Sequence, residues 1–261
     1  MKKPPISYYG GKQRLVSTIL PLFPAHVLYN EPFAGGLALL FGKERSEVEV
    51  VNDTNTELIN FYKVMKQDFV SLQKQVAITL HSRKQHEHAR VIYAFPELFS
   101  ELQRAWAVWV LATQSFASSL TTSWGFDLNR NTHGKKIVNK TIAFDESYAV
   151  RLQNVQIECA DALYVIRSRD HENAFHYCDP PYYNSDCRHY GGYTLDDYTR
   201  LLETLAGVKG KFLLSSYTSE VLDKFVSEHG WHQIRINQTV SVCAKSGVRK
   251  PKTDVLTANY P

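Results

Sequence analysis

Four consecutive residues combine a carboxylate, a stiff turn and an aromatic ring: Asp179-Pro180-Pro181-Tyr182. Two adjacent prolines fix φ and remove two backbone donors, so the turn is rigid. Such a turn can aim the Asp179 carboxylate and the Pro180 carbonyl at an amino group, while the Tyr182 ring stacks on a planar substrate. The turn follows the apolar run 174–178, and open α/β sheets bind ligands at the carboxyl ends of their strands. This position favours a functional role over the alternative, a structural Pro-Pro turn with a capping Asp.

A second set of residues could contact a nucleotide-like ligand. The turn Glu31-Pro32-Phe33-Ala34-Gly35-Gly36 contains glycines, which let a ligand approach the backbone closely. It lacks the G-x-G-x-x-G and G-K-[ST] patterns, so a dinucleotide or a nucleoside triphosphate fits it weakly. Asp53 follows about 20 residues later, where an acidic side chain can accept hydrogen bonds from both ribose hydroxyls. The alternative for Asp53 is an N-cap of the following helix.

The elements that must position these residues alternate between strands and helices at both ends of the chain. Expected strands span residues 26–30, 47–51, 174–178, 211–216, 231–237 and 253–258. Expected helices span residues 12–22, 37–43, 54–65, 194–206 and 219–229, and Thr54 with Glu57 matches a capping box. Residues 66–120 are helical in pattern, and residues 121–140 are polar and predict a hairpin or long loop. This order predicts a doubly wound α/β sheet with an inserted, mainly helical domain.

Several motifs, in this order and spacing, resemble the Dam-type (alpha-class, DPPY) DNA adenine-N6 methyltransferases. The residues that carry the resemblance are Tyr9-Gly10-Gly11-Lys12, the turn from Glu31 to Gly36, Asp53, Asp161, Asp179 to Tyr182, and Arg249-Lys250 with Asp254-Val255-Leu256. The resemblance implies a Rossmann-like class I methyltransferase sheet. It implies a catalytic S-adenosylmethionine-binding domain in residues 1–65 and 151–261. Residues 66–150 would be the target-recognition insert, with helices and a hairpin near 121–140.

The resemblance also implies roles for individual residues. Tyr9 and Lys12 would lie against the methionine end of S-adenosylmethionine, Asp53 would hold the ribose hydroxyls, and Asp161 would accept a hydrogen bond from the cofactor's adenine. The full set of implied cofactor-binding residues is Tyr9, Gly10, Lys12, Glu31, Pro32, Phe33, Ala34, Gly35, Asp53, Asp161 and Asp179. From the residues alone, Lys12 could be a solvated lysine at a helix start and Asp161 a helix cap.

The implied catalytic residues are Asp179, Pro180, Pro181 and Tyr182. The N6 lone pair of adenine is delocalised into the ring, so the amine needs polarising by two acceptors, the Asp179 carboxylate and the Pro180 carbonyl. The lone pair would then attack the sulfonium methyl in line, without a metal or a covalent enzyme intermediate. Because the target atom is buried in a duplex, the base must flip out and stack on Tyr182. Asp rather than Ser at the first position favours adenine N6 over cytosine N4.

Duplex DNA is the partner that the resemblance implies. The candidate DNA-binding residues are Trp124, Asn129, Arg130, Asn131, Lys135, Lys136, Tyr190, Lys245, Arg249, Lys250 and Lys252. Arg and Asn read guanine and adenine edges, and the C-terminal lysines suit phosphates, although a solvated charged loop is the alternative for that cluster. Tyr190 and Tyr193 could close over the flipped base or pack as surface aromatics. The run from Gln114 to Ser119 departs from the Dam pattern, so no target sequence is predicted.

Bulk composition fits this interpretation without requiring it. The chain has 261 residues, a formal net charge of +4 and a sequence pI of about 8.7, which permits a polyanionic partner. The four cysteines show no C-x-x-C spacing, which argues against a zinc ribbon or a redox pair. The N-terminal residues have no signal-peptide pattern, and no apolar run approaches ~18 residues, so a cytoplasmic location is expected.

Two rival functions remain open at this stage. One is adenine-N6 methylation of RNA, which would use a similar basic surface. The other is a catalytically silent, nucleic-acid-binding relative, which the intact Asp179 to Tyr182 motif argues against. His81, His86 and His88 have a spacing that could suggest metal ligands, but their charged neighbours indicate a solvated helix face. No obligatory protein partner is evident.

Overall fold

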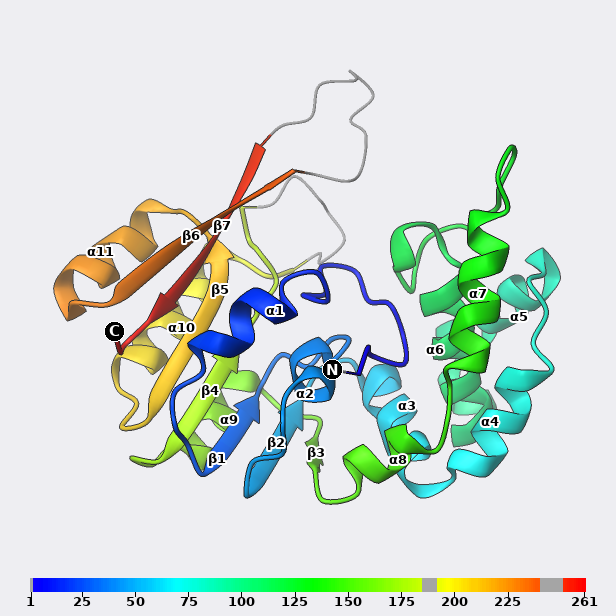
Figure 1. Ribbon diagram of the computed structural model, residues 1–261, viewed down its shortest axis with the longest axis horizontal. Helices are drawn as coiled ribbons and strands as arrows, with labels where there is room; N and C mark the ends of the chain where they lie inside the picture. The colour runs from blue at the N-terminus through cyan, green and yellow to red at the C-terminus, as the bar shows by residue number, and fades with distance from the viewer. Residues whose placement is uncertain (1, 185–191, 240–250) are drawn as a thin grey trace. The chain divides into compact units, whose positions relative to one another are not determined.

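The computed structural model describes residues 2–184, 192–239 and 251–261 (Figure 1). Its strands are β1 (Leu28–Glu31), β2 (Val48–Asn52), β3 (Gln156–Glu158), β4 (Ala174–Cys178), β5 (Lys211–Tyr217), β6 (His232–Thr239) and β7 (Pro251–Ala258). They form a seven-stranded sheet in the order β3-β2-β1-β4-β5-β7-β6. The β2–β3, β1–β4 and β4–β5 pairs are parallel, whereas β7 is antiparallel to both β5 and β6. The expected α/β class with a doubly wound sheet is therefore confirmed.

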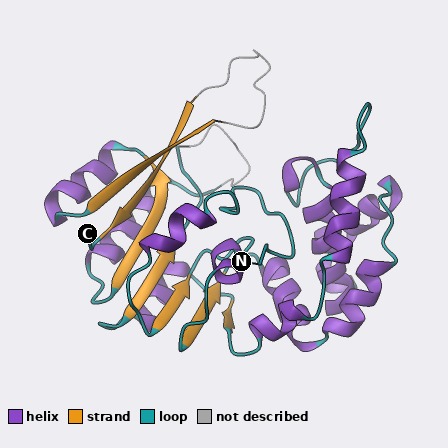
Figure 2. Ribbon diagram, viewed as in Figure 1, coloured by secondary structure: helices purple, strands orange, loops and turns teal. Residues whose placement is uncertain are grey.

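Helices separate most of the strands and make up most of the chain between β2 and β3 (Figure 2). The helices are α1 (Val16–Ile19), α2 (Ala38–Gly42), α3 (Thr56–Gln67), α4 (Phe69–Ala77), α5 (Arg83–Ala94), α6 (Glu101–Gln114), α7 (Thr132–Ile142), α8 (Ser147–Leu152), α9 (Ala162–Arg169), α10 (Leu195–Ala206) and α11 (Glu220–His229). Short 3₁₀ segments span Leu20–Leu22, Pro96–Leu98 and Phe116–Ser118. The helical character expected for residues 66–120 is present.

The chain divides into two compact units, each of which is described separately. The first comprises Met1–Leu22, Ala34–Arg45 and Glu49–Ala160; the second comprises Phe23–Phe33, Ser46–Val48 and Asp161–Pro261. These boundaries differ from the expected split into residues 1–65 with 151–261 and an insert of 66–150. The assignment of a catalytic domain and a target-recognition insert therefore stays a prediction.

The core of the first unit lies where α3 and α6 bury large side chains. Phe61 and Tyr62 of α3 and Trp109 of α6 are fully buried, and burying such rings supplies much of the hydrophobic stabilisation. A charged contact adds to this packing, because Arg104 Nε donates to Glu57 Oε2 at 2.8 Å. The same ion pair holds the pKa of Arg104 above its usual value, with the hydrogen bond to Glu57 as the main cause.

The second unit has one apolar cluster beside β4 and β5. Helices α9, α10 and α11 contribute Ile166, Leu202 and Leu222, which pack with Cys178 of β4 and Leu214 of β5. These helices therefore cover one face of the two strands. On the other face, the ring of Phe23 lies 4.7 Å from that of Phe175. Buried on both faces, β4 is apolar along most of its length, as central parallel strands usually are.

Two of the expected helices begin next to a capping side chain. Thr194 forms a capping box with Asp197 at the start of α10, and the Ser219 side chain accepts a hydrogen bond from Leu222 N at the start of α11. The cap expected at Thr54 is wrong. Asn55 caps α3 instead, because its side chain accepts hydrogen bonds from the backbone N–H groups of Glu57 and Leu58.

Two expected elements differ from the structure. The helix expected over residues 12–22 is reduced to α1 and the 3₁₀ segment after it, because Lys12 is not helical and residues 13–15 form a turn. Of the hairpin or long loop expected over 121–140, the hairpin is absent and the loop is present only as far as Asn131, because residues from Thr132 onward form α7. The strand pairing nearby is one isolated bridge between Ser115 and Trp124. Asp127 explains the helix start, since its carboxylate accepts a hydrogen bond from His133 N and supplies a cap from outside the helix.

Candidate active site

The Asp179 turn lies at the carboxyl end of β4, within the second unit. All five residues of β4 are buried, and the parallel β1 and β5 flank this strand. Asp179 itself is half-buried, and Pro180 is buried. The stiff turn therefore emerges from a strand that cannot shift, at the edge of the sheet where α/β proteins bind ligands.

Tyr182 is held in place by two residues of β5. Its hydroxyl lies 2.8 Å from Ser215 Oγ, and its ring meets that of Tyr217 edge to face at a centroid distance of 4.4 Å. Burial raises the pKa of Tyr182 well above its usual value, with the nearby carboxylates of Asp179 and Asp254 adding to the rise. The phenol therefore stays neutral and serves as a fixed aromatic surface beside the turn.

The end of β1 lies at the same edge of the sheet as the Asp179 turn. The register pairs Asn30 with His176, and the Asn30 amide Nδ2 lies 3.0 Å from His176 Nδ1. Glu31 follows, is only 3% exposed, and accepts a hydrogen bond from the Tyr29 hydroxyl at 2.8 Å. Phe33 packs against the apolar cluster of the second unit. Parallel pairing of β1 with β4 thus places residues 31–33, which were predicted to bind the cofactor, and Asp179 at neighbouring strand ends.

In the first unit, Asp53 is tied to the small-residue turn. Gly35 N donates to Asp53 Oδ2 at 3.0 Å, and Asn55 N donates to Asp53 Oδ1 at 2.9 Å. Burial raises the pKa of Asp53, while these two backbone hydrogen bonds oppose the rise. Each carboxylate oxygen has one backbone donor and keeps a second lone pair, so two hydroxyl groups of a ligand could still donate to it. The alternative role of Asp53, as the N-cap of the following helix, is wrong, because Asn55 is the N-cap of α3.

Tyr8 is a residue of this group that the sequence analysis missed. Its ring lies against the turn: a Cβ on Gly35 would be 3.3 Å from Tyr8 Cδ1, and one on Gly36 would be 3.1 Å from Tyr8 Cβ. Burial raises the pKa of Tyr8, the Asp53 carboxylate adds to the rise, and a hydrogen bond with Asn55 opposes it. The signal in the sequence was the tandem pair Tyr8-Tyr9 before two glycines, from which only the second tyrosine was chosen.

Lys12 and Asp161 have structural contacts of their own. Lys12 is 9% exposed, and its Nζ donates to Gly10 O at 3.2 Å, so it is not the solvated lysine of the alternative interpretation. Asp161, in the second unit, is the N-cap of α9 and accepts a hydrogen bond from Tyr164 N at 2.9 Å. The capping role weighed for Asp161 is therefore present, and its side chain remains exposed to solvent.

Trp124 lies inside a stack of rings in the first unit. Its ring is 4.8 Å from that of His81 and 5.6 Å from that of Phe126, and the Arg83 guanidinium lies 4.8 Å above it. His81 also stacks on His133 at 6.0 Å. This packing is typical of a residue that supports a loop. The residues expected to read DNA next to it, Asn129, Arg130, Asn131 and Lys135, are exposed.

The remaining expected DNA contacts fall into two groups. Lys136, on α7, donates from Nζ to Ser118 Oγ at 3.3 Å. Tyr190, Lys245, Arg249 and Lys250 lie outside the described residues, as does the side chain of Lys252. Tyr193 is described, and its ring packs against the apolar cluster of the second unit, in line with the packing alternative.

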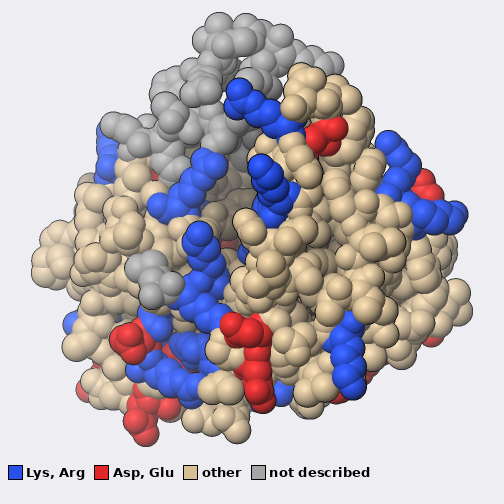
Figure 3. Space-filling model, turned by 45° about the vertical axis from the view of Figure 1, so that its right-hand side comes forward, with Lys and Arg blue, Asp and Glu red and all other residues tan. Residues whose placement is uncertain are grey.

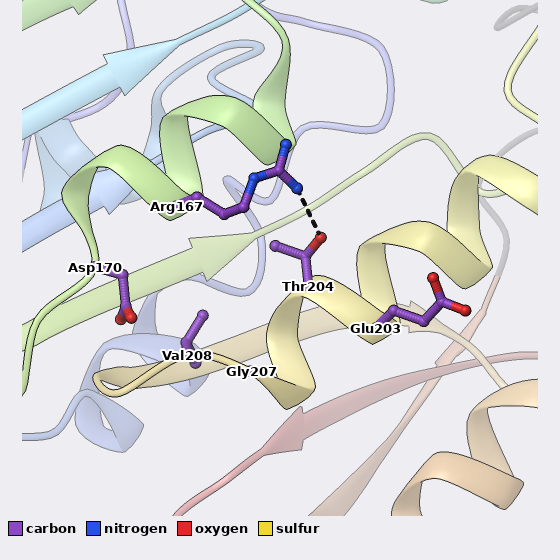
Figure 4. A pocket seen from close by; sticks show the side chains of 6 residues that line it. All are labelled: Arg167, Asp170, Glu203, Thr204, Gly207 and Val208. Carbon is purple, nitrogen blue, oxygen red and sulfur yellow. Dashed lines mark hydrogen bonds between the residues drawn. The ribbon is translucent and has the colours of Figure 1, made fainter.

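An open hollow in the second unit lies away from these residues. It has a volume of about 350 Å³ (Figure 4), and its lining residues are Arg167, Asp170, Glu203, Thr204, Gly207 and Val208. Asp170 precedes β4 and Gly207 precedes β5, so the hollow lies near the amino ends of these strands, opposite to the Asp179 turn. Arg167 reaches Thr204 across it, with 3.4 Å between Nη1 and Oγ1. The hollow is therefore a surface feature separate from the candidate site.

The three histidines of the sequence cluster have separate partners. His81 contacts Gly125 O at 2.9 Å, and buried His86 contacts Ser115 Oγ at 2.8 Å through Nε2. The His88 ring lies against that of Trp106. Within the described residues, no group of three His, Cys, Asp or Glu side chains could hold a metal ion. In the same part of the chain, no helix has the length and apolar character needed to span a membrane.

Comparison with known proteins agrees with the geometry. Residues 8–240 match the family of D12 class N6 adenine-specific DNA methyltransferases. The type II methyltransferase M1.LlaDCHI of Lactococcus lactis subsp. cremoris is 27% identical over 282 residues, which cover 99% of this chain and 95% of that protein. The type II methyltransferase M.FokI of Planomicrobium okeanokoites is 23% identical over 99% of this chain but 43% of its own length. The DNA N-6-adenine-methyltransferase of Escherichia phage P1 is 27% identical over 66% of this chain and 23% of its own length.

The family match covers most of the sequence and includes the Asp179 turn, the turn after β1 and Asp53. The mixed seven-stranded sheet is consistent with the class I methyltransferase fold. The chain belongs to the D12 class of N6 adenine-specific DNA methyltransferases.

Proposed function

We propose that this chain transfers a methyl group from S-adenosylmethionine to the N6 amino group of adenine in a specific duplex DNA sequence, by base flipping and direct in-line attack. The observation that carries the proposal is the rigid Asp179 turn beside a fixed aromatic ring. Asp179 and the Pro180 carbonyl follow a fully buried strand, and Tyr182 is anchored by Ser215 at 2.8 Å. Family membership supports the same substrate class.

The residues present suit S-adenosylmethionine as the donor. Asp53 carries one backbone hydrogen bond on each carboxylate oxygen, which leaves acceptor sites for the two ribose hydroxyls. Gly35 has a φ of 46° and no side chain, so its backbone is open to a close approach. Bound there, S-adenosylmethionine would supply an activated methyl group on a sulfonium.

The side chains of this protein would act on the adenine. The Asp179 carboxylate and the Pro180 carbonyl accept hydrogen bonds from the two N6 hydrogens, which draws the nitrogen toward tetrahedral geometry and frees its lone pair. Tyr182 provides the surface on which a flipped base stacks, and its neutral hydroxyl is already committed to Ser215. A carboxylate and a carbonyl fixed before the reaction need no reorganisation, which is the main source of electrostatic catalysis.

In the expected recognition region, the exposed Asn129, Arg130 and Asn131 precede α7, and Lys135 lies on it. Side chains of these types pair with purine edges and with phosphates. The stacked Trp124 supports the loop from behind, through His81 and Phe126. Trp124 therefore acts on DNA through the loop that it supports.

A direct assay separates this proposal from its rivals. The purified protein is incubated with S-adenosylmethionine carrying a labelled methyl group, and with duplex DNA or structured RNA of mixed sequence. Digestion and mass spectrometry then locate the label. N6-methyladenine in the duplex DNA is the expected product. Label confined to RNA would overturn the substrate, and bound cofactor without transfer to either nucleic acid would overturn the activity.

A further inference from the structure

Three lysines of the first unit gather without a carboxylate. Lys136 and Lys140 are four residues apart on α7, so they share one face of the helix. Lys140 Nζ donates to Pro4 O at 2.8 Å, which brings Lys3 close to it, and Lys136 Nζ donates to Ser118 Oγ at 3.3 Å. Within the described residues, none of these lysines forms an ion pair with Asp or Glu. Each of the two bonded ammonium groups therefore rests on a neutral oxygen.

This arrangement is electrostatically unfavourable when nothing else is bound. Like charges four residues apart on a helix repel each other and destabilise the helix. Burial, together with the charges of Lys136 and Lys3, lowers the pKa of Lys140 to about 8. A half-buried ammonium group whose charged neighbours are other ammonium groups would be stabilised by a bound anion.

A neighbouring lysine shows the contrast. Lys2 pairs with Asp145, with Nζ 2.9 Å from Oδ1, so its charge is compensated within the protein. The positive charge of Lys3, Lys136 and Lys140 has no such compensation. Figure 3 shows that Lys and Arg side chains are spread over the face that it presents. The whole chain also has more basic than acidic side chains, with a formal net charge of +4.

We propose that Lys3, Lys136 and Lys140 form a binding site for a backbone phosphate of the DNA. The inference rests on the proposed function and adds Lys3 and Lys140 to its contacts. Ammonium groups on flexible stems suit a phosphate as point charges, without reading the base sequence. The site lies on α7, directly after the exposed Asn129, Arg130 and Asn131. A phosphate held there would fix the position of the duplex relative to the residues that read it.

The test is the salt dependence of binding to a fluorescent duplex, followed by anisotropy between 50 and 200 mM salt. Lys140→Gln removes the charge and keeps an N–H donor on a side chain that is one bond shorter. Each lost phosphate contact should reduce the slope of log K against log salt by about 0.9 and weaken binding several-fold at low salt. The turnover number at saturating DNA and the affinity for S-adenosylmethionine should stay unchanged. Lys140→Arg, which keeps the charge, should retain most of the slope.

Lys224→Gln is the matched control, because Lys224 is exposed on α11 and faces Glu228 at 3.8 Å. It removes one charge from a compensated pair and should leave the slope as in the unmodified protein. Should Lys140→Gln fail to fold, the exposed Lys136→Gln measures the same site. A slope and affinity unchanged in a folded Lys140→Gln or Lys136→Gln protein would overturn the phosphate site. If the unmodified protein binds DNA with this salt dependence but does not methylate it, the proposed function fails and the phosphate site stands.

Discussion

The backbone N–H of Gly35 donates to the Asp53 carboxylate at 3.0 Å, so the turn after β1 and the residue after β2 are joined by one hydrogen bond. The carboxylate is half-buried, and its other oxygen accepts from Asn55 N. Asp53 therefore holds the turn in place and still has lone pairs for a ligand. A change at Asp53 should for this reason alter the affinity for the cofactor.

Asp53→Ala should weaken S-adenosylmethionine binding more than it changes the chemical step. Hydrogen bonds to a charged group are worth about 1.5–3 kcal/mol, so we expect the Kd to rise roughly 10- to 100-fold. Titration calorimetry measures this directly, and single-turnover methylation at saturating cofactor measures the chemistry. An unchanged Kd in the folded variant would exclude the ribose contact.

Gly35→Ala should be destabilising, because the φ of 46° is unfavourable for a residue with a Cβ and that atom would press on Tyr8 at 3.3 Å. We expect a loss of about 1–2 kcal/mol in the free energy of unfolding and weaker cofactor binding. The matched control is Gly207→Ala, since a Cβ there meets nothing closer than 3.7 Å and φ is −97°. Chemical denaturation compares the two. Equal effects at both positions would show that the turn tolerates a side chain.

Tyr182→Phe should mainly lower stability, whereas Tyr182→Ala should also lower methyl transfer to duplex DNA. The phenylalanine variant loses the hydrogen bond with Ser215, worth about 1 kcal/mol, and keeps the ring. We expect it to stay active with a lower thermal midpoint. The alanine variant also loses base stacking, worth about 1–3 kcal/mol, so transfer to duplex DNA should fall further. Loss of activity in the phenylalanine variant equal to that in the alanine variant would show that the hydroxyl, and not the ring, is what the reaction needs.

Glu49 should control acid stability in the first unit. Burial acts to raise the pKa of this carboxyl, but hydrogen bonds from Arg151 and Lys43 outweigh it and hold the pKa below 4.5. A lowered pKa in the folded state stabilises the fold fully above pH 4.5, and this stability is lost as the pH falls through the folded-state value. Glu49→Gln should cost about 3–5 kcal/mol at neutral pH, since both cations remain buried.

The measurement is urea unfolding of the unmodified protein and Glu49→Gln between pH 7 and pH 3. The difference between the two should shrink on the acid side. The exposed Glu228→Gln, which breaks a surface pair with Lys224, should change stability by at most about 0.5 kcal/mol. If the difference in the free energy of unfolding between the two proteins stays constant with pH, Glu49 does not control acid stability.

The sequence predicts the strands and helices near the Asp179 turn well, because their signals are local. The expected strand 174–178 coincides with β4, whose burial on both faces gives a short apolar run. Thr194 and Ser219 are helix caps with their partners a few residues away. At these positions the hydrophobic pattern and the capping residue indicate the same helix start, so the predicted helix boundaries are close to the observed ones.

The errors occur where contacts outside an element, and not its own sequence pattern, decide the structure. Helix α7 begins with the help of Asp127, six residues before the N–H that it accepts from, and it buries only Ile137 fully. Gly134 and β-branched residues weaken its local signal, so a hairpin was expected there. Tyr8 was not predicted for a similar reason. Its role depends on its contact with Gly35, which lies far along the chain.

The most direct measurement compares N6-methyladenine formation in duplex DNA by the unmodified protein and by Asp179→Ala, with S-adenosylmethionine affinity measured on the same samples. The expected result is methylated adenine with the unmodified protein and a rate at least about 10²–10³-fold lower with the variant, at similar cofactor affinity. Turnover by Asp179→Ala close to that of the unmodified protein would contradict the role given to the turn after β4.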